Sequence, residues 1–162
     1  MLAFLKKLKS DPNEVVAPAN GTLIDLSTVS DPVFAQKMMG DGFAIKPDVS
    51  SGTIEIFAPV SGKIVSLPAT KHAVGIHTKA GKDILVHIGI DTVDLKGDGF
   101  EAFAQQGDQV NRGDKLISVD AQKLKDAKLD NTIMVIFTGE TDKQLNFDIG
   151  YNNEVKSKEK LM

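Results

Sequence analysis

The sequence contains no cysteine, and this absence removes several kinds of protein at once. Disulfide scaffolds, thiolate nucleophiles and zinc sites built on cysteine are all excluded. Arginine is almost absent as well, because Arg112 is the single arginine in the chain. Binding of phosphate by bidentate guanidinium groups is therefore not expected from the chain itself. The lack of cysteine agrees with a cytoplasmic setting, which is the location we expect.

Long apolar stretches and an excess of positive charge are also missing. No segment approaches the roughly 18 apolar residues that a membrane-spanning helix requires. The first residues, MLAFLKKLKSD, have too short an apolar region for a secretory signal and no small-residue cleavage site. The net charge of −3 argues against a nucleic-acid partner, which would require a basic face.

Short strands dominate the 162 residues, a length suited to one domain. Runs rich in Ile, Val and Thr are bounded by Gly, Pro, Asp or Ser, and they lie at 21–28, 52–59, 62–69, 71–78, 83–90, 115–120 and 131–138. Helical signals are limited to 32–39 and to 120–128, where Asp120 is the expected N-cap. This pattern predicts an all-β fold, an antiparallel sandwich or barrel-like structure with short helical turns.

The ends of the chain differ from its middle. Residues 11–150 are expected to form the single domain. Residues 1–10 place Met1, Phe4, Leu5 and Leu8 on one helical face. Two interpretations stay open for this segment: peripheral contact with a membrane, or a frayed chain end. The polar tail 151–162 has no periodicity and is expected to be loose.

His87 interrupts the aliphatic run ILVHIGI, and a hairpin closed by KAGK brings a second histidine toward it. If Thr78 pairs with Asp83, His72 lies opposite Gly89 and diagonal to His87; a tighter loop places the two histidines face to face. Either register holds the imidazoles within reach of one site. His77 is expected on the opposite face and outside the site. Gly89 is expected to leave a bare spot beside the imidazole.

Three chemistries compete for such a pair. Zinc held by His72 and His87 would need a third ligand, for which Asp91 or Asp31 is available, so a metal-binding regulatory protein is one alternative. Hydrolysis lacks a nucleophile motif such as Gly-x-Ser-x-Gly. Nucleophilic attack by a neutral imidazole on phosphorus remains, with the second ring donating a hydrogen bond to the phosphoryl oxygens.

Four segments resemble a known family: HIGIDTVDLKGDGF, ATKHAVGI, IFAPVSGKI and DPVFAQKMMGDGFAIKP. They are similar to the glucose-type IIA component of the bacterial phosphoenolpyruvate-dependent sugar phosphotransferase system, and the resemblance extends from about Val15 to Asp148. It implies that His87 accepts a phosphoryl group on Nε2 from the histidine-containing phosphocarrier protein and passes it to a cysteine of the IIB domain of a sugar permease. It further implies that His72 supports the phosphoryl group and that Thr70 orients the neighbouring histidine.

The resemblance also implies a docking surface, regulatory target proteins reached through protein contact, and no cofactor. An apolar rim is expected at Val33, Phe34, Ile88 and Val93, with acidic groups that meet basic partners at Asp31 and Asp91. Pro32 and the Lys37–Met39 run depart from the usual pattern. A biotinyl- or lipoyl-type carrier module is the remaining alternative, because GDQVNRGDKLISVD resembles its hairpin and Lys37 lies beside two methionines.

Overall fold

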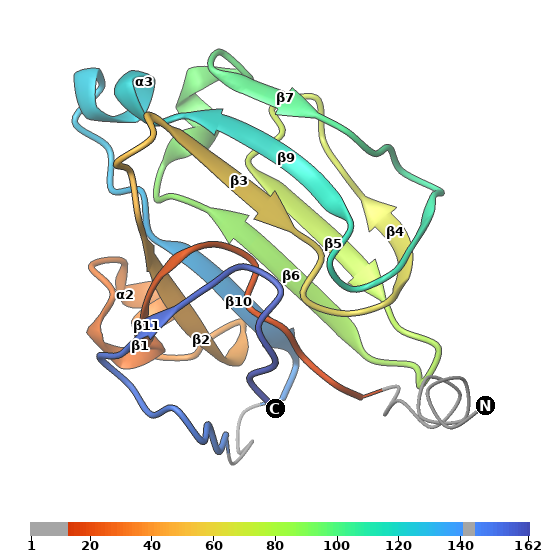
Figure 1. The fold of residues 1–162 in the computed structure, drawn as a ribbon. Coiled ribbons are helices and arrows are strands. Elements are labelled where there is room, and N and C mark those ends of the chain that lie inside the picture. Colours follow the sequence, from red (N-terminus) through yellow and green to blue (C-terminus); the bar gives the residue numbers. More distant parts are fainter. Residues whose placement is uncertain (1–12, 141–144) are drawn as a thin grey trace.

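The computed structural model describes residues 13–140 and 145–162, and most of them belong to two antiparallel β-sheets (Figure 1). The larger sheet has eight strands in the order β11-β1-β2-β10-β6-β5-β4-β8. These strands are β1 (Gly21–Asp25), β2 (Gly40–Pro47), β4 (Gly62–Ser66), β5 (Ala73–His77), β6 (Asp83–Ile88), β8 (Gln109–Val110), β10 (Ile133–Thr138) and β11 (Glu154–Val155).

The smaller sheet has three strands in the order β3-β9-β7, and it packs over one face of the larger sheet. Its strands are β3 (Thr53–Phe57), β7 (Phe100–Ala102) and β9 (Lys115–Asp120). Within the described residues, helical structure is limited to η1 (Leu26–Thr28), α2 (Pro32–Ala35), η2 (Thr92–Leu95) and α3 (Ala121–Asp126). The expected all-β sandwich with short helical turns is confirmed, and the Asp120 side chain caps α3 by accepting from the Gln122 N–H at 3.0 Å.

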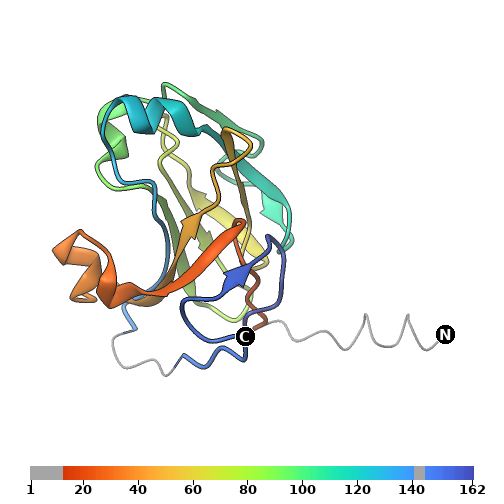
Figure 2. The same ribbon diagram turned by 60° about the vertical axis from the view of Figure 1, so that its left-hand side comes forward.

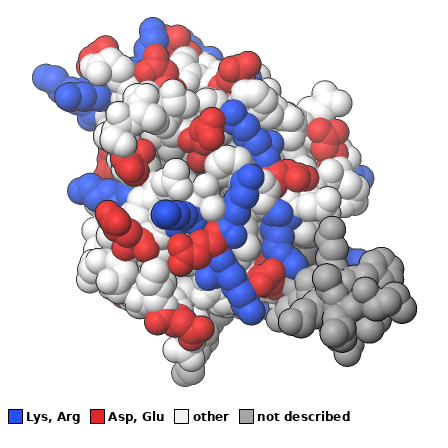
Figure 3. All heavy atoms as spheres, viewed as in Figure 1, with Lys and Arg blue, Asp and Glu red and all other residues white. Residues whose placement is uncertain are grey.

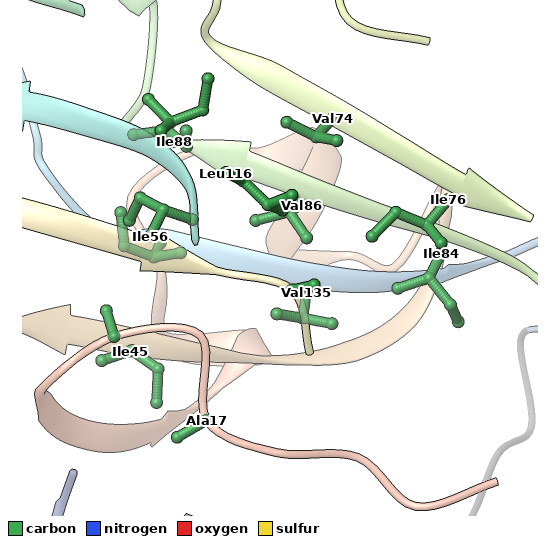
Figure 4. Close-up of a cluster of buried hydrophobic side chains, with 14 of the residues drawn as sticks. Ala17, Ile45, Ile56, Val74, Ile76, Ile84, Val86, Ile88, Leu116 and Val135 are labelled. Atoms are coloured by element: carbon green, nitrogen blue, oxygen red, sulfur yellow. The ribbon is translucent and has the colours of Figure 1, made fainter. Parts of the chain in front are cut away.

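The main hydrophobic core fills the space between the two sheets. Side chains from β5, β6 and β10 point inward toward those of β3 and β9, as Figure 4 shows for Val74, Val86, Ile88, Ile56 and Leu116. A second, smaller cluster lies on the other side of the larger sheet, where the segment of η1 and α2 covers it; its buried members are Leu26, Val29, Phe34, Ala44, Ile90, Met134 and Ile136. In the turned view, α2 projects from this outer side (Figure 2). Each face of the larger sheet therefore has its own packing.

Strand β2 has no counterpart among the expected strands, and its glycines explain why. A side chain at Gly42 would place Cβ 1.9 Å from the Val135 carbonyl oxygen on β10, and one at Gly40 would place it 2.2 Å from that of Phe137. Because the strand is buried on both faces, seven of its eight residues are buried, and period-two alternation is lost.

The prediction of a loose C-terminal tail is wrong. Val155 and Leu161 are 3% and 4% exposed, β11 pairs with β1, and the Val15 N–H donates to the Met162 carbonyl at 2.7 Å. Val155 and Leu161 are buried in the core and Tyr151 and Met162 pack against it, but their spacing along this otherwise polar segment produces no period in the sequence. The expected amphipathic segment 1–10 lies outside the described residues.

Charges of both signs are interspersed on the face that carries β3 and β9 (Figure 3). Lys115 pairs with Glu55 at 3.2 Å and Arg112 with Glu14 at 2.8 Å. This face therefore lacks the single-sign patch that a polyanion would require. In the part of the chain that the structure describes, no helix has the length and apolar character needed to span a membrane.

Candidate phosphohistidine site

His87 lies on the outer side of the larger sheet, near the end of β6. Ile84, Val86 and Ile88 point into the main core, so Leu85 and His87 face the other way. Phe34, carried by α2, packs against the imidazole with the ring centroids 4.9 Å apart. The imidazole is half-buried. It packs against the second hydrophobic cluster through Phe34 and is still accessible to solvent.

The two histidines meet, but through neither of the expected strand registers. Ala73 is the residue opposite His87, and His77 is opposite Asp83. Continued strand geometry would have placed His72 opposite Ile88, on the core face. Instead β5 begins only at Ala73, after Lys71 in the left-handed conformation with φ 56°. His72 therefore lies just before the strand: its carbonyl still accepts from the Ile88 N–H at 2.8 Å, while its ring lies beside that of His87, with the ring centroids 5.3 Å apart at 78°.

His77 is outside the site, although the reason expected from the sequence is wrong. Its side chain shares the outer face with His87, because His77 and Ala73 have the same parity on β5. Ala73, the residue opposite His87, lies four residues before His77 on β5, which is about 13 Å along the strand at 3.3 Å per residue. His77 instead pairs with its cross-strand neighbour, and its Nδ1 lies 2.7 Å from Asp83 Oδ1.

The hydrogen bond of the His87 ring identifies the nitrogen that is free. His87 Nδ1 lies 2.8 Å from the Gly89 carbonyl oxygen. A carbonyl can only accept, so Nδ1 must carry the hydrogen and donate it. In the neutral ring, Nε2 then holds the lone pair and is the ring atom that is chemically able to act as a nucleophile.

Burial keeps this ring neutral. Desolvation is the main cause that lowers the pKa of His87 below 6.5; the charge of a protonated His72 lowers it further, while the Gly89 hydrogen bond and the carboxylates of Asp31 and Asp91 oppose the shift. Desolvation also lowers the pKa of His72. Both imidazoles are therefore mainly unprotonated at neutral pH.

We expect the titration midpoints of His87 and His72 to lie below 6.5 in an NMR pH titration of the folded chain. Because the unfolded chain takes up protons first, the stabilisation linked to the neutral rings is present above pH 6.5 and declines as the pH falls through the lower folded pKa. Urea unfolding at a series of pH values checks this, and His87→Gln should flatten the acid limb. Midpoints above 6.5 would contradict it.

The orientation of His72 is set by the residue two positions before it. Thr70 Oγ1 lies 2.7 Å from His72 Nδ1, so the hydroxyl and the ring nitrogen share one hydrogen bond. With Nδ1 engaged, His72 Nε2 is the atom available to a ligand bound between the rings. The family resemblance implies an orienting role of this kind for Thr70. Which of the two atoms donates depends on the tautomer of His72.

Gly89 supplies a carbonyl rather than a bare spot, so this part of the sequence prediction is wrong. The residue is buried, with φ 72°. An added Cβ would lie 2.5 Å from Thr92 Cγ2 and 2.8 Å from the Asp130 carbonyl oxygen. Thr92 is itself fully buried, and its hydroxyl donates to the Ile88 carbonyl. The loop therefore holds the Gly89 carbonyl rigidly under His87.

Gly89→Ala should destabilise the fold by about 1–3 kcal/mol, because the left-handed backbone and two close contacts are both incompatible with Cβ. Gly81→Ala is the matched control, since Gly81 also has a positive φ of 87° but no atom lies within 4 Å of its Cβ position. Chemical denaturation of both variants measures the difference. Equal losses would show that crowding around Gly89 contributes nothing.

The expected docking rim is only partly exposed. Val33 on α2 and Val93 on η2 are 42% and 45% exposed, so both are available for contact with a partner. Phe34 is buried and contacts His87, so it supports the ring from below. Ile88 is fully buried in the main core (Figure 4), and its assignment to the rim is wrong. The alternation of a strand places the neighbours of an outward residue inside.

Asp31 and Asp91 both act on His87 through their charge. Asp31 also caps α2, because its Oδ1 accepts from the Val33 N–H at 2.8 Å while Pro32 occupies the first turn. Asp91 is exposed, has φ 61° and makes no side-chain capping bond to η2. Its carboxylate is thus presented to solvent beside the histidine pair.

The two rival sites receive little support from the geometry. Among residues 13–140 and 145–162, His, Asp and Glu side chains form no group of three suited to a metal ion, so neither Asp31 nor Asp91 completes a zinc site with the histidines. Lys37 follows α2 with φ 59°, and its Nζ pairs with Asp41 Oδ1 at 3.3 Å. It is not at the tip of a hairpin, as a biotinyl or lipoyl lysine would be.

Comparisons with known proteins agree with the site. The family model described as phosphoenolpyruvate-dependent sugar phosphotransferase system, EIIA 1, matches residues 13–143. The chain belongs to this family. The resemblance to the glucose-type IIA component, stated from the four sequence segments, is confirmed.

Individual relatives cover nearly the whole chain. The glucose-specific EIIA component of Halalkalibacterium halodurans is 44% identical over 159 residues, covering 95% of this chain and 89% of that protein. The solved structure of glucose permease IIA from Mycoplasma capricolum superposes with a TM-score of 0.78 at 42% identity, covering 91% of this chain and 92% of that one. A glucose-specific EIICBA component of Streptococcus pneumoniae is 46% identical over 125 residues, which are 77% of this chain and 17% of that protein.

Proposed function

We propose that the chain is a phosphoryl carrier of the sugar phosphotransferase system, with His87 as the residue that is phosphorylated. The observation that carries this proposal is the 2.8 Å hydrogen bond from His87 Nδ1 to the Gly89 carbonyl, which leaves Nε2 as the free lone pair of a neutral ring. Membership of the EIIA 1 family supports the same function.

In the accepting step, His87 Nε2 attacks phosphorus on the phosphohistidine of the histidine-containing phosphocarrier protein. The P–N bond of the donor breaks, its imidazole leaves with the electron pair, and a new P–N bond forms at Nε2. In the second step, a thiolate of a IIB domain attacks the same phosphorus, and His87 leaves as a neutral ring. Each transfer exchanges one bond to phosphorus for another.

His72 stabilises the transferred group. If the Thr70 hydroxyl donates to His72 Nδ1, the hydrogen of the neutral His72 ring lies on Nε2, which can donate to a phosphoryl oxygen. A neutral donor suits a carrier, because a cation would hold the dianion too strongly for onward transfer. The lowered pKa of His72 keeps the ring in this form.

The docking surface consists of Val33 and Val93 around the site, Phe34 beneath it, and Asp31 and Asp91 as its acidic groups. The carboxylates steer basic partner surfaces toward His87 and thereby favour encounter rate and specificity more than affinity. The IIB partner is supported by the EIICBA relatives, in which a segment similar to this chain is part of a longer protein. A carrier between such partners acts in the cytoplasm.

The test is to incubate the full chain with phosphoenolpyruvate and the two general proteins of the system, and to measure its intact mass. We expect a gain of one phosphoryl group that is labile in acid and stable in base, as for a phosphoramidate. Addition of a IIB domain should remove it. Absence of the mass gain, or a gain that is stable in acid, would overturn the proposal.

A further inference from the structure

The carboxylate of Asp130 connects two segments that are far apart in the sequence. Its Oδ2 accepts from the Ser30 hydroxyl at 2.9 Å, across 100 residues of chain. Its Oδ1 accepts from the Thr132 N–H at 2.9 Å and from the Thr132 hydroxyl at 2.6 Å. Asp130 thus joins the segment before β10 to the segment before α2.

One arm of this network reaches the peptide that binds His87. The Asp130 carbonyl accepts from the Ile90 N–H at 2.9 Å, and the Thr132 carbonyl accepts from the Gly89 N–H at 2.9 Å. The Ile90 N–H belongs to the same planar peptide as the Gly89 carbonyl and points in the opposite direction. The bond to Asp130 therefore fixes the plane in which the Gly89 carbonyl meets His87 Nδ1.

The other arm reaches Phe34, a second contact of the ring. Ser30 immediately precedes Asp31, the N-cap of α2, and α2 carries Phe34 against the His87 imidazole. By holding Ser30, the Asp130 carboxylate connects the start of this short helix to the segment before β10. Asp130 is therefore connected to two of the groups that contact the imidazole: to Phe34 through its carboxylate, and to the Gly89–Ile90 peptide through its own carbonyl and through Thr132, which the carboxylate binds.

We propose that Asp130 is a positioning residue that fixes the tautomer and the orientation of His87 through the Gly89–Ile90 peptide and through α2. The role in phosphoryl transfer rests on the proposed function, whereas the effect on the tautomer does not. Burial raises the pKa of Asp130, but hydrogen bonds from Thr132 and Ser30 and the charge of Lys46 outweigh it, so the net pKa is lowered. At neutral pH the carboxylate can therefore accept all three bonds.

The experiment compares Asp130→Ala with Asp126→Ala, a matched loss of an exposed carboxylate on α3. The ring nitrogens of His87 are followed by ¹⁵N NMR in the unphosphorylated chain. We expect the wild type and Asp126→Ala to show a single tautomer with hydrogen on Nδ1, and Asp130→Ala to show a mixture of tautomers. The rate of phosphoryl acceptance should fall about tenfold, as expected for the loss of an orienting group. The final extent of phosphorylation should be unchanged.

Asp130→Asn tests the geometry of the bonds. The asparagine oxygen can still accept from Thr132, and its amide can donate to the Ser30 hydroxyl, so we expect most of the single tautomer to return. A folded Asp130→Ala variant whose His87 keeps one tautomer would overturn the proposal. If Asp130→Ala does not fold, Thr132→Val and Ser30→Ala test the two arms separately by the same NMR measurement. Because this measurement needs no phosphoryl donor, it gives its result even if the chain accepts no phosphoryl group.

Discussion

His87→Gln should accept no phosphoryl group, whatever the concentration of the donor protein. The substitution retains a polar side chain of similar length but removes the Nε2 lone pair, and the remaining imidazole of the site, His72, is proposed to carry hydrogen on its Nε2 and so to donate rather than attack. Intact mass after incubation with phosphoenolpyruvate and the general phosphotransferase proteins measures the loss. The expected result is the complete absence of the phosphorylated species.

His77→Gln provides the control for this variant. His77 lies on the same face of the sheet and its Nδ1 is 2.7 Å from Asp83 Oδ1, so it is another hydrogen-bonded imidazole. Along β5, His77 lies about 13 Å from the residue opposite His87, beyond the reach of one bound phosphoryl group. It should be phosphorylated to the same extent as the wild type. Mass gain by His87→Gln, or its loss in His77→Gln, would show that the acceptor is assigned to the wrong residue.

His72→Ala should separate the two halves of the transfer. His87 keeps its own tautomer through Gly89, so the variant should still accept a phosphoryl group. Transfer to the IIB thiolate should slow by about 100-fold, because a preorganised hydrogen-bond donor to the transferring group is lost. Single-turnover mixing of the phosphorylated variant with a IIB domain, followed by quenching in base, measures this step.

Thr70 variants distinguish the donor role of His72 from simple packing. Thr70→Ser keeps the hydroxyl and should transfer nearly as fast as the wild type. Thr70→Ala leaves the His72 tautomer unset, so about half of the molecules would lack hydrogen on Nε2 if the two tautomers were equally stable. Its transfer rate should therefore fall between those of the wild type and His72→Ala. Full activity in both His72→Ala and Thr70→Ala would show that phosphoryl transfer does not use this donor.

The sequence predicted the strands and the two histidines well because both leave local signals. Runs of Ile and Val between turn residues mark the strands, and His87 interrupts such a run. Strand β2 was not predicted, because Gly40 and Gly42 allow β10 to pack closely and the strand shows no alternation of apolar and polar residues. The strand register was not predicted because the hairpin turn sets it: the Thr78 N–H donates to the Lys82 carbonyl, which pairs His77 with Asp83.

The surroundings of the imidazole could be predicted less well than the imidazole itself. Ile88 was placed beside His87 because it is adjacent in sequence, yet strand geometry sends adjacent side chains to opposite faces. Asp130 has no sequence signal at all, since it lies 43 positions from His87 in the numbering and acts through backbone groups. Hydrogen bonds of this kind become visible only when the fold brings the segments together.

The pairing of Val15 with Met162 has a consequence for how such a domain can be joined to others. The two residues line one small cavity with Ile84 at the beginning of β6, whereas His87 lies near the end of that strand. A tether attached at this place leaves the molecule beside the opposite end of the strand from the reactive nitrogen. A domain joined at this place would therefore leave the surface around His87 uncovered, and the length of the tether would set its effective concentration there.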